Sequence, residues 1–267
     1  MADEAHKLHA EGGAANRLMA LRGGRLFEIK VLDGAWTRDW PEPAPAHFTA
    51  LTFTEQTNEY TFVSALTEDG TLYAIGVPGG GWAKDWPTKP PKQLYRIAGK
   101  SGVDPYLFGL DVENTLWATQ LPVGGWVPDF PQRPPSPLVD IAAQGGSDPH
   151  LFGIGQDGNL YAIGLDGGGW VKDYPKPPPV PLQRLAVQDG PTGMLLAIDV
   201  NNGLWALGLP DGVWVQNWPK APPSAIFDIT VQSGGGNYLF VTGETETIYA
   251  IQLPFGKWQK DFPAPLP

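Results

Sequence analysis

The stretch GGGWVKDYP, residues 167–175, decides the fold, because its core pattern Trp-x-x-Asp-aromatic-Pro occurs six times along the chain, once with Asn in place of Asp. The six tryptophans are Trp36, Trp82, Trp126, Trp170, Trp214 and Trp258, so the first step is 46 residues and the other four are 44. Six such units account for nearly all of the 267 residues, which makes the repeat the architecture of the protein. We expect a single domain over residues 1–267.

Each unit contains four short apolar segments. In the unit that ends at residue 175 these are LVDIAAQ from 138, HLFGIG from 150, LYAI from 160 and the tryptophan segment. They are rich in aromatic and branched residues and are bounded by Gly, Pro, Asn or Asp, which is typical of β-strands. The dipeptide Asp157-Gly158, like Asp69-Gly70 and Asn202-Gly203, predicts a tight antiparallel hairpin between the second and third segments. Proline stretches such as PKPPPVP, residues 175–181, lack backbone N–H donors and should separate one sheet from the next.

Four antiparallel strands in each of six units predict an all-β fold, a six-bladed β-propeller of four-stranded blades with about 44 residues per repeat. The first-type segment recurs at 48, 94, 138, 182 and 226, and the chain ends at Pro267 before another copy would begin. Residues 7–21, KLHAEGGAANRLMAL, resemble residues 138–154. We therefore expect the N-terminal segment to complete the last blade and so close the ring.

Composition and motifs exclude several classes of function. The net charge of −10 disfavours binding to a phosphate backbone, and the absence of cysteine excludes disulfides and thiolate chemistry. We expect no cofactor and no metal, because the four histidines are not spaced as ligands and no nucleotide-binding or nucleophile motif occurs. No apolar run is long enough to cross a bilayer, and the polar start lacks the features of a signal peptide. We expect a cytoplasmic protein, or one released without a classical signal peptide, that does not insert into membranes.

The repeated aromatic and polar positions suggest a site for a neutral glycan, since an indole face can stack on the C–H face of a sugar while carboxylates and amides bond its hydroxyls. The candidate ligand-binding residues are the repeat tryptophans, the Asp or Asn three positions later, and the glutamine that ends the first segment: Trp36, Trp82, Asp85, Trp126, Asp129, Trp170, Asp173, Trp214, Asn217, Trp258, Gln144, Gln188 and Gln232. A structural reading stays open for all of them. The tryptophans can fill the core, and the polar residues can bond turn backbone.

The layout of the repeat resembles a known family. An L-[YWF]-A-[IV] strand after a D-G turn (LYAI at 72 and 160), a Trp-and-Pro region, an L-x2-[IL]-A strand (LVDIA at 138) and a Gly-rich turn before F/L-F-G are similar to the propeller lectins of the tachylectin and tectonin type. The unit here is longer than a tectonin repeat. The resemblance implies a multivalent carbohydrate-binding protein with sites in or between the blades and with glycans or glycoconjugates as partners. It assigns no individual site residue.

No unit carries a long insertion or a cluster of His, Asp and Glu that the other units lack. The sequence therefore favours six similar sites and a protein that is not an enzyme. Two other classes stay open. One is a hydrolase, isomerase or cyclase that uses the central channel for an apolar small molecule, and the other is a protein-interaction ring without a small ligand.

Overall fold

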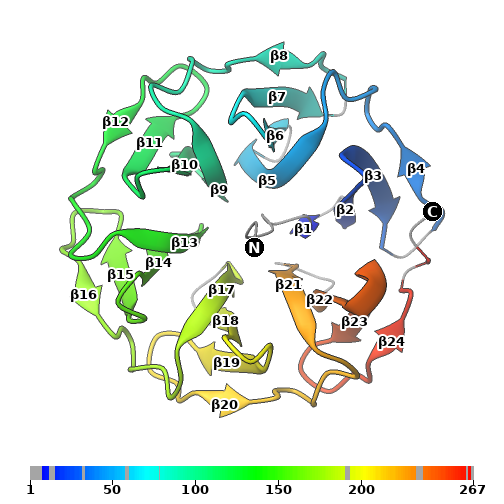
Figure 1. The fold of residues 1–267 in the computed structure, drawn as a ribbon, viewed down its shortest axis with the longest axis vertical. Coiled ribbons are helices and arrows are strands. Elements are labelled where there is room, and N and C mark those ends of the chain that lie inside the picture. Colours follow the sequence, from blue (N-terminus) through cyan, green and yellow to red (C-terminus); the bar gives the residue numbers. More distant parts are fainter. Residues whose placement is uncertain are drawn as a thin grey trace.

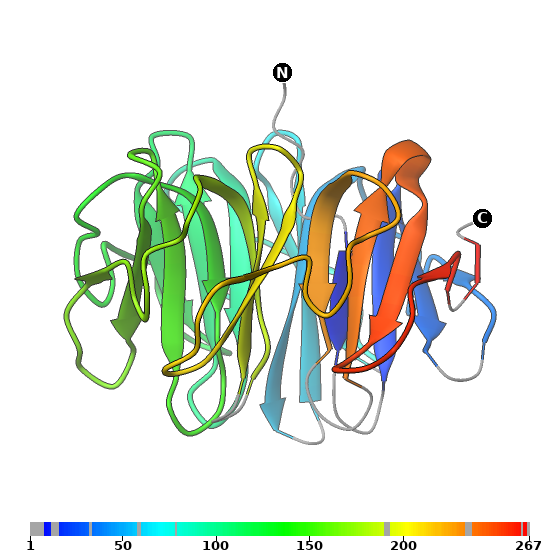
Figure 2. The ribbon, with the colours of Figure 1, turned by 90° about the horizontal axis from the view of Figure 1, so that it is seen from below.

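The computed structural model describes residues 8–11, 16–31, 34–57, 60–77, 79–189, 193–232, 237–262 and 264–265. It confirms the all-β, six-bladed propeller (Figure 1). Each blade is a four-stranded antiparallel sheet whose strands follow in chain order from the central axis to the rim. The strands run between the two faces of the ring (Figure 2). One face carries the turns between second and third strands, and the other, which we call the loop face, carries the remaining connections within blades.

The first three blades are contiguous in the sequence. Blade A consists of β1 (Leu8–Glu11), β2 (Arg17–Arg22), β3 (Arg25–Lys30) and β4 (Thr37–Arg38). Blade B consists of β5 (Phe48–Thr57), β6 (Tyr60–Thr67), β7 (Leu72–Val77) and β8 (Ala83–Lys84). Blade C consists of β9 (Leu94–Lys100), β10 (Tyr106–Asp111), β11 (Leu116–Gln120) and β12 (Val127–Pro128).

The other three blades follow the same plan. Blade D consists of β13 (Leu138–Ala143), β14 (His150–Gly155), β15 (Leu160–Gly164) and β16 (Val171–Lys172). Blade E consists of β17 (Leu182–Val187), β18 (Met194–Asp199), β19 (Leu204–Gly208) and β20 (Val215–Gln216). Blade F consists of β21 (Ile226–Val231), β22 (Tyr238–Gly243), β23 (Ile248–Gln252) and β24 (Gln259–Lys260), with the short helix η1 (Glu244–Glu246) between β22 and β23. No helix in the described residues is long and apolar enough to cross a membrane.

The hydrophobic core lies between consecutive blades. At the D–E interface, Phe152 and Ile154 of blade D pack with Leu182 and Leu195 of blade E. Similar clusters occupy the five other interfaces. Because a blade is covered on both faces, its middle strands are continuous apolar runs and do not alternate strictly between apolar and polar residues.

Buried polar side chains join the innermost strands of neighbouring blades. The Asp140 carboxylate of β13 lies 3.3 Å from the Arg96 guanidinium of β9 and accepts a hydrogen bond from the backbone N–H of Leu185 in β17 (2.8 Å). The Thr52 hydroxyl of β5 likewise accepts from the Gly99 N–H of β9 (3.0 Å). These bonds satisfy backbone donors that the sheets themselves leave open near the axis.

The expectation that the N-terminal segment completes the last blade is wrong. β1 pairs with β2, and blade F takes all four of its strands from residues 226–260. The N-terminal segment forms the innermost strand of a unit, so it pairs with β2, and β3 and β4 complete the same blade. The ring closes through contacts between complete blades. The Asp228 carboxylate of blade F accepts from the Leu8 N–H (2.9 Å), and the Trp36 indole of blade A donates to the Ala264 carbonyl beyond blade F (2.9 Å).

The predicted hairpins between second and third strands are confirmed in all six blades. Each turn has one residue with a positive φ at an equivalent position, namely Gly24, Gly70, Asn114, Gly158, Asn202 and Glu246. Glycine and asparagine tolerate this backbone conformation, whereas glutamate does not adopt it without a steric cost. Glu246 is therefore a strained position.

We expect Glu246→Gly to stabilise the protein by about 0.5–1 kcal/mol, because glycine relieves the left-handed φ of +58°. The lost ion pair with Arg22 (3.4 Å) is exposed and contributes little. Urea denaturation of the two proteins measures the difference, with Gly158→Glu as the reverse substitution that should destabilise. A loss of stability in Glu246→Gly would show that the ion pair outweighs the strain.

Candidate functional site

Six pairs of side chains, one from each blade, recur on the loop face. Each pair consists of a residue near the start of the second strand and the aromatic residue before the proline. Contacts are present in Arg17/Trp40, Phe62/Trp86, Tyr106/Phe130, His150/Tyr174 and Tyr238/Phe262. At the sixth position, Met194 and Trp218 both pack against the cluster between blades E and F. In four of them the two rings stack with centroids 4.4 to 5.4 Å apart. The pre-proline aromatics pack against the clusters between blades and remain partly exposed, so each interface presents an aromatic surface.

The six repeat tryptophans join neighbouring blades. Each indole N–H donates to a backbone carbonyl in the proline-rich link that precedes its blade in the ring, and each ring packs on the cluster between the two blades. The bonds are Trp36 to Ala264, Trp82 to Glu42, Trp126 to Thr88, Trp170 to Gln132, Trp214 to Lys176 and Trp258 to Lys220, at 2.8 to 3.3 Å. This placement supports the structural reading. Sugar binding by these tryptophans stays a prediction.

The residue three positions after each tryptophan has a backbone role. Asp85, Asp129, Asp173 and Asn217 have φ between 54° and 57°, a conformation that Asp and Asn tolerate better than most residues. Their backbone N–H groups donate to the third-strand carbonyls of Leu72, Leu116, Leu160 and Leu204. Their side chains are half-buried, and their contribution to ligand binding stays a prediction.

The three candidate glutamines lie at the ends of the innermost strands and link neighbouring blades. The Gln144 amide donates to the Gln188 carbonyl (3.4 Å), and the Gln188 amide donates to the Gln232 carbonyl (3.2 Å). The Gln232 amide donates to the Asn16 side chain (3.2 Å), which continues the series into blade A. Of the three, Gln144 also lines a pocket.

Blade A differs from the other five at its stacked pair. The Arg17 guanidinium lies 4.4 Å from the centre of the Trp40 ring, and its Nε is 3.4 Å from the Glu28 carboxylate. The Arg17 side chain is 16% exposed and that of Glu28 is 6% exposed. Burial raises the pKa of the Glu28 carboxyl, and the positive charges of Arg17 and Lys30 oppose that shift. The positions equivalent to Glu28 are all alanine: Ala74, Ala118, Ala162, Ala206 and Ala250.

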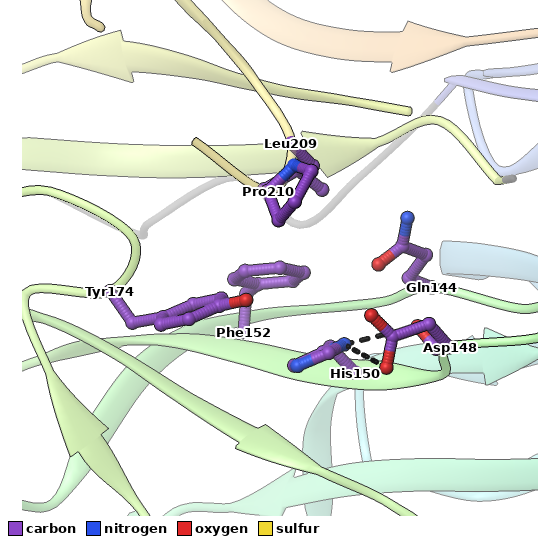
Figure 3. A pocket seen from close by; sticks show the side chains of 7 residues that line it. All are labelled: Gln144, Asp148, His150, Phe152, Tyr174, Leu209 and Pro210. Carbon is purple, nitrogen blue, oxygen red and sulfur yellow. Dashed lines mark hydrogen bonds and ion pairs between the residues drawn. The ribbon is translucent and has the colours of Figure 1, made fainter. Parts of the chain in front are cut away.

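The D–E interface holds a pocket next to its stacked pair (Figure 3). The rings of His150 and Tyr174 are nearly parallel, with an angle of 9° and centroids 5.4 Å apart. Phe152 continues this aromatic wall, and Leu209 and Pro210 of blade E face it. Gln144 and Asp148 lie on the side of the pocket nearer the β13–β14 connection, where His150 Nδ1 is 3.0 Å from the Asp148 carbonyl oxygen.

The six interfaces therefore differ in some of their side chains, and the expectation of six similar sites stays a prediction. Sequence comparison of the units could have found the exceptions. RLMALR at 17 has arginine where YLFGLD at 106 has an aromatic residue, and LFEI at 26 has glutamate where LYAI at 72 has alanine. Arg17 and Glu28 do not stand out among the positions that all units share, which are the ones that define the repeat. In the described part of the chain, His, Asp and Glu side chains form no group of three or more that could hold a metal ion.

No protein-family model and no curated protein matches this chain. Solved structures do match it over almost its full length. The structure of SapL1 lectin in complex with alpha methyl fucoside has a TM-score of 0.70 and 17% identity, and the alignment covers 97% of this chain and 96% of that one. A mutant of AofleA from Arthrobotrys oligospora gives 0.71 and 13% over 96% of this chain and 86% of that one. A mutant of Aleuria aurantia lectin in complex with Fucα1-6GlcNAc gives 0.65 and 14% over 98% and 97%. At these identities the chain shares the propeller fold of these lectins, and its function has to be argued from the site.

Proposed function

We propose that this protein is a non-enzymatic lectin that binds glycans at the interfaces between blades, with the A–B interface as its principal site. The observation that carries the proposal is the group Arg17, Glu28 and Trp40. The fold does not require it, because five blades form the same sheet with an apolar or aromatic residue or His150 in place of arginine and alanine in place of glutamate. A buried ion pair is costly to form, so its presence in one blade only points to a ligand.

The chemistry of this group suits a neutral sugar. The planar guanidinium of Arg17 offers several N–H donors in a fixed geometry, and the Glu28 carboxylate offers acceptors. Adjacent sugar hydroxyls, which both donate and accept, match such a donor and acceptor side by side. The partly exposed indole of Trp40 supplies an apolar surface for the sugar C–H groups.

The similar solved structures suggest which sugar to test first. Those of SapL1 and Aleuria aurantia lectin contain an α-methyl fucoside or a fucosylated disaccharide, so α-linked fucosides come first. The other stacked pairs would add weaker sites, and binding to cell-surface glycans would then gain from avidity. The layout of the repeat, which resembles lectins of the tachylectin and tectonin type, also supports the proposal.

The test uses conservative variants of the A–B interface. We expect Glu28→Gln and Arg17→Lys each to weaken binding of methyl α-fucoside, or of the best ligand found on a glycan array, by about tenfold, because each removes one or two hydrogen bonds to the sugar. Isothermal titration measures the effect. Arg133→Ala, which removes an exposed arginine from a proline-rich link, is the matched control and should leave binding unchanged. A well-folded protein that binds no glycan on the array would refute the proposal.

A further inference from the structure

The pocket at the D–E interface differs from the A–B site in its chemistry. The cavity has a volume of about 20 Å³, room for roughly one water-sized group and far below the roughly 300–1,000 Å³ of pockets that enclose a whole ligand. It therefore has room for a substituent of a ligand and not for an oligosaccharide. Its lining has no arginine or lysine: Gln144, Asp148, His150, Phe152, Tyr174, Leu209 and Pro210.

Acceptor atoms gather on one side of this pocket. Gln144 is 4% exposed, its amide nitrogen donates to the Gln188 carbonyl of blade E, and its amide oxygen lies on the side of Asp148 (Figure 3). The Asp148 carboxylate lies at the mouth with 73% of its side chain exposed. Among the described residues the Tyr174 hydroxyl makes no hydrogen bond, and it lies beside Phe152 (Figure 3).

Two carboxylates act on the tyrosine hydroxyl of this pocket. Burial raises the pKa of the Tyr174 hydroxyl, and the charges of Asp148 on blade D and Asp211 on blade E raise it further. The hydroxyl thus stays protonated and neutral, while two carboxylates from opposite sides of the interface act on the same place. A positively charged group would be stabilised here, and an anion would be repelled.

The tyrosine and histidine are particular to this interface. The other five pre-proline residues are Trp40, Trp86, Phe130, Trp218 and Phe262, so packing at this position needs an aromatic ring and no hydroxyl. None of the equivalent stacked pairs contains an imidazole. The polar lining of the D–E pocket is therefore not explained by the fold.

We propose that the D–E pocket binds a small primary ammonium group, such as that of an amino sugar. The rings of His150, Phe152 and Tyr174 offer aromatic faces or edges to the cation, and the oxygens of Asp148 and Gln144 accept from a primary ammonium. This site is separate from Arg17 and Glu28, and it does not require the A–B interface to bind sugar.

The experiment titrates the full chain with glucosamine and choline, and with glucose and N-acetylglucosamine as neutral comparisons. We expect glucosamine to bind about tenfold or more tightly than both neutral sugars and than choline, whose trimethylammonium group is too large for the cavity, and its preference over the neutral sugars to fall as salt is added. Asp148→Asn and Tyr174→Phe should each remove most of the preference. Phenylalanine is already present at the equivalent positions 130 and 262, so Tyr174→Phe should fold. Asp104→Asn, at the position of blade C equivalent to Asp148, is the matched control.

Preference for glucosamine alone would indicate a hydrogen-bonded primary ammonium and supports the site. Preference for choline would overturn it, because a trimethylammonium group does not fit the cavity. Equal binding of charged and neutral compounds would overturn it, as would an equal effect of Asp104→Asn and Asp148→Asn, which indicates general attraction to an acidic surface. Fucoside binding without an ammonium preference refutes this inference and leaves the lectin proposal intact. An ammonium preference together with no binding to any glycan on the array would support this site and refute the lectin proposal.

Discussion

Asp140→Ala should lower the free energy of unfolding by about 3–5 kcal/mol, because it removes one partner of a buried ion pair. Arg96 and Asp140 are 1% and 0% exposed, and Asp140 Oδ1 lies 3.3 Å from Arg96 Nε. Without the carboxylate the guanidinium is left as a charge in the interior, and the Leu185 N–H of the next blade loses its acceptor. The substitution thus weakens two blade interfaces at once, C–D and D–E.

Urea denaturation followed by tryptophan fluorescence measures this effect. Asp104→Ala, which removes an exposed carboxylate, should change stability by less than about 0.5 kcal/mol. The double variant Arg96→Met/Asp140→Leu should be more stable than Asp140→Ala, since it also removes the buried Arg96 guanidinium. A cost below about 1 kcal/mol for Asp140→Ala would mean that solvent reaches Arg96 and that the pair is not part of the interior.

The fold could be predicted because the same strand-like segments recur in every unit of the sequence. One unit with strand-like segments would be ambiguous, but LVDIAAQ, LQRLAVQ and IFDITVQ recur with the same period and the same Gly and Pro boundaries. It was harder to predict where the first and last blades meet and so where the chain closes the ring. Whether the N-terminal segment joins the last blade or begins its own depends on which strand of the unit is innermost, and hydrophobicity does not show this. β1 is innermost, so blade A is complete in itself.

The candidate site was harder to predict for a different reason. A period of 44 residues directs attention to positions that every unit shares, such as Trp170 and Asp173, and those positions hold the fold together. In the two proposed sites, the residues that would contact a ligand are ones where a unit departs from the others, such as Arg17 and Tyr174. Such departures carry information only once the register between strands is known, because only the register shows that Arg17 and Glu28 meet across β2 and β3.

Trp170→Ala should destabilise the protein by about 2–4 kcal/mol and leave the affinity for sugar unchanged. The indole packs against the C–D cluster and its N–H donates to the Gln132 carbonyl (2.8 Å), so its loss opens a cavity and breaks a bond between two blades. The value lies below that of a fully buried tryptophan because the ring is partly exposed.

Trp170→Phe separates packing from hydrogen bonding. It retains an aromatic ring but has no donor for Gln132, so we expect a cost of about 1 kcal/mol. Both variants are compared with the unmodified protein by urea denaturation and by glycan titration. If Trp170→Ala instead removed a sugar site while the urea midpoint stayed unchanged, Trp170 would be a sugar-stacking residue. The same result would then be expected at the other five tryptophans, because all six make the same bond to the preceding link.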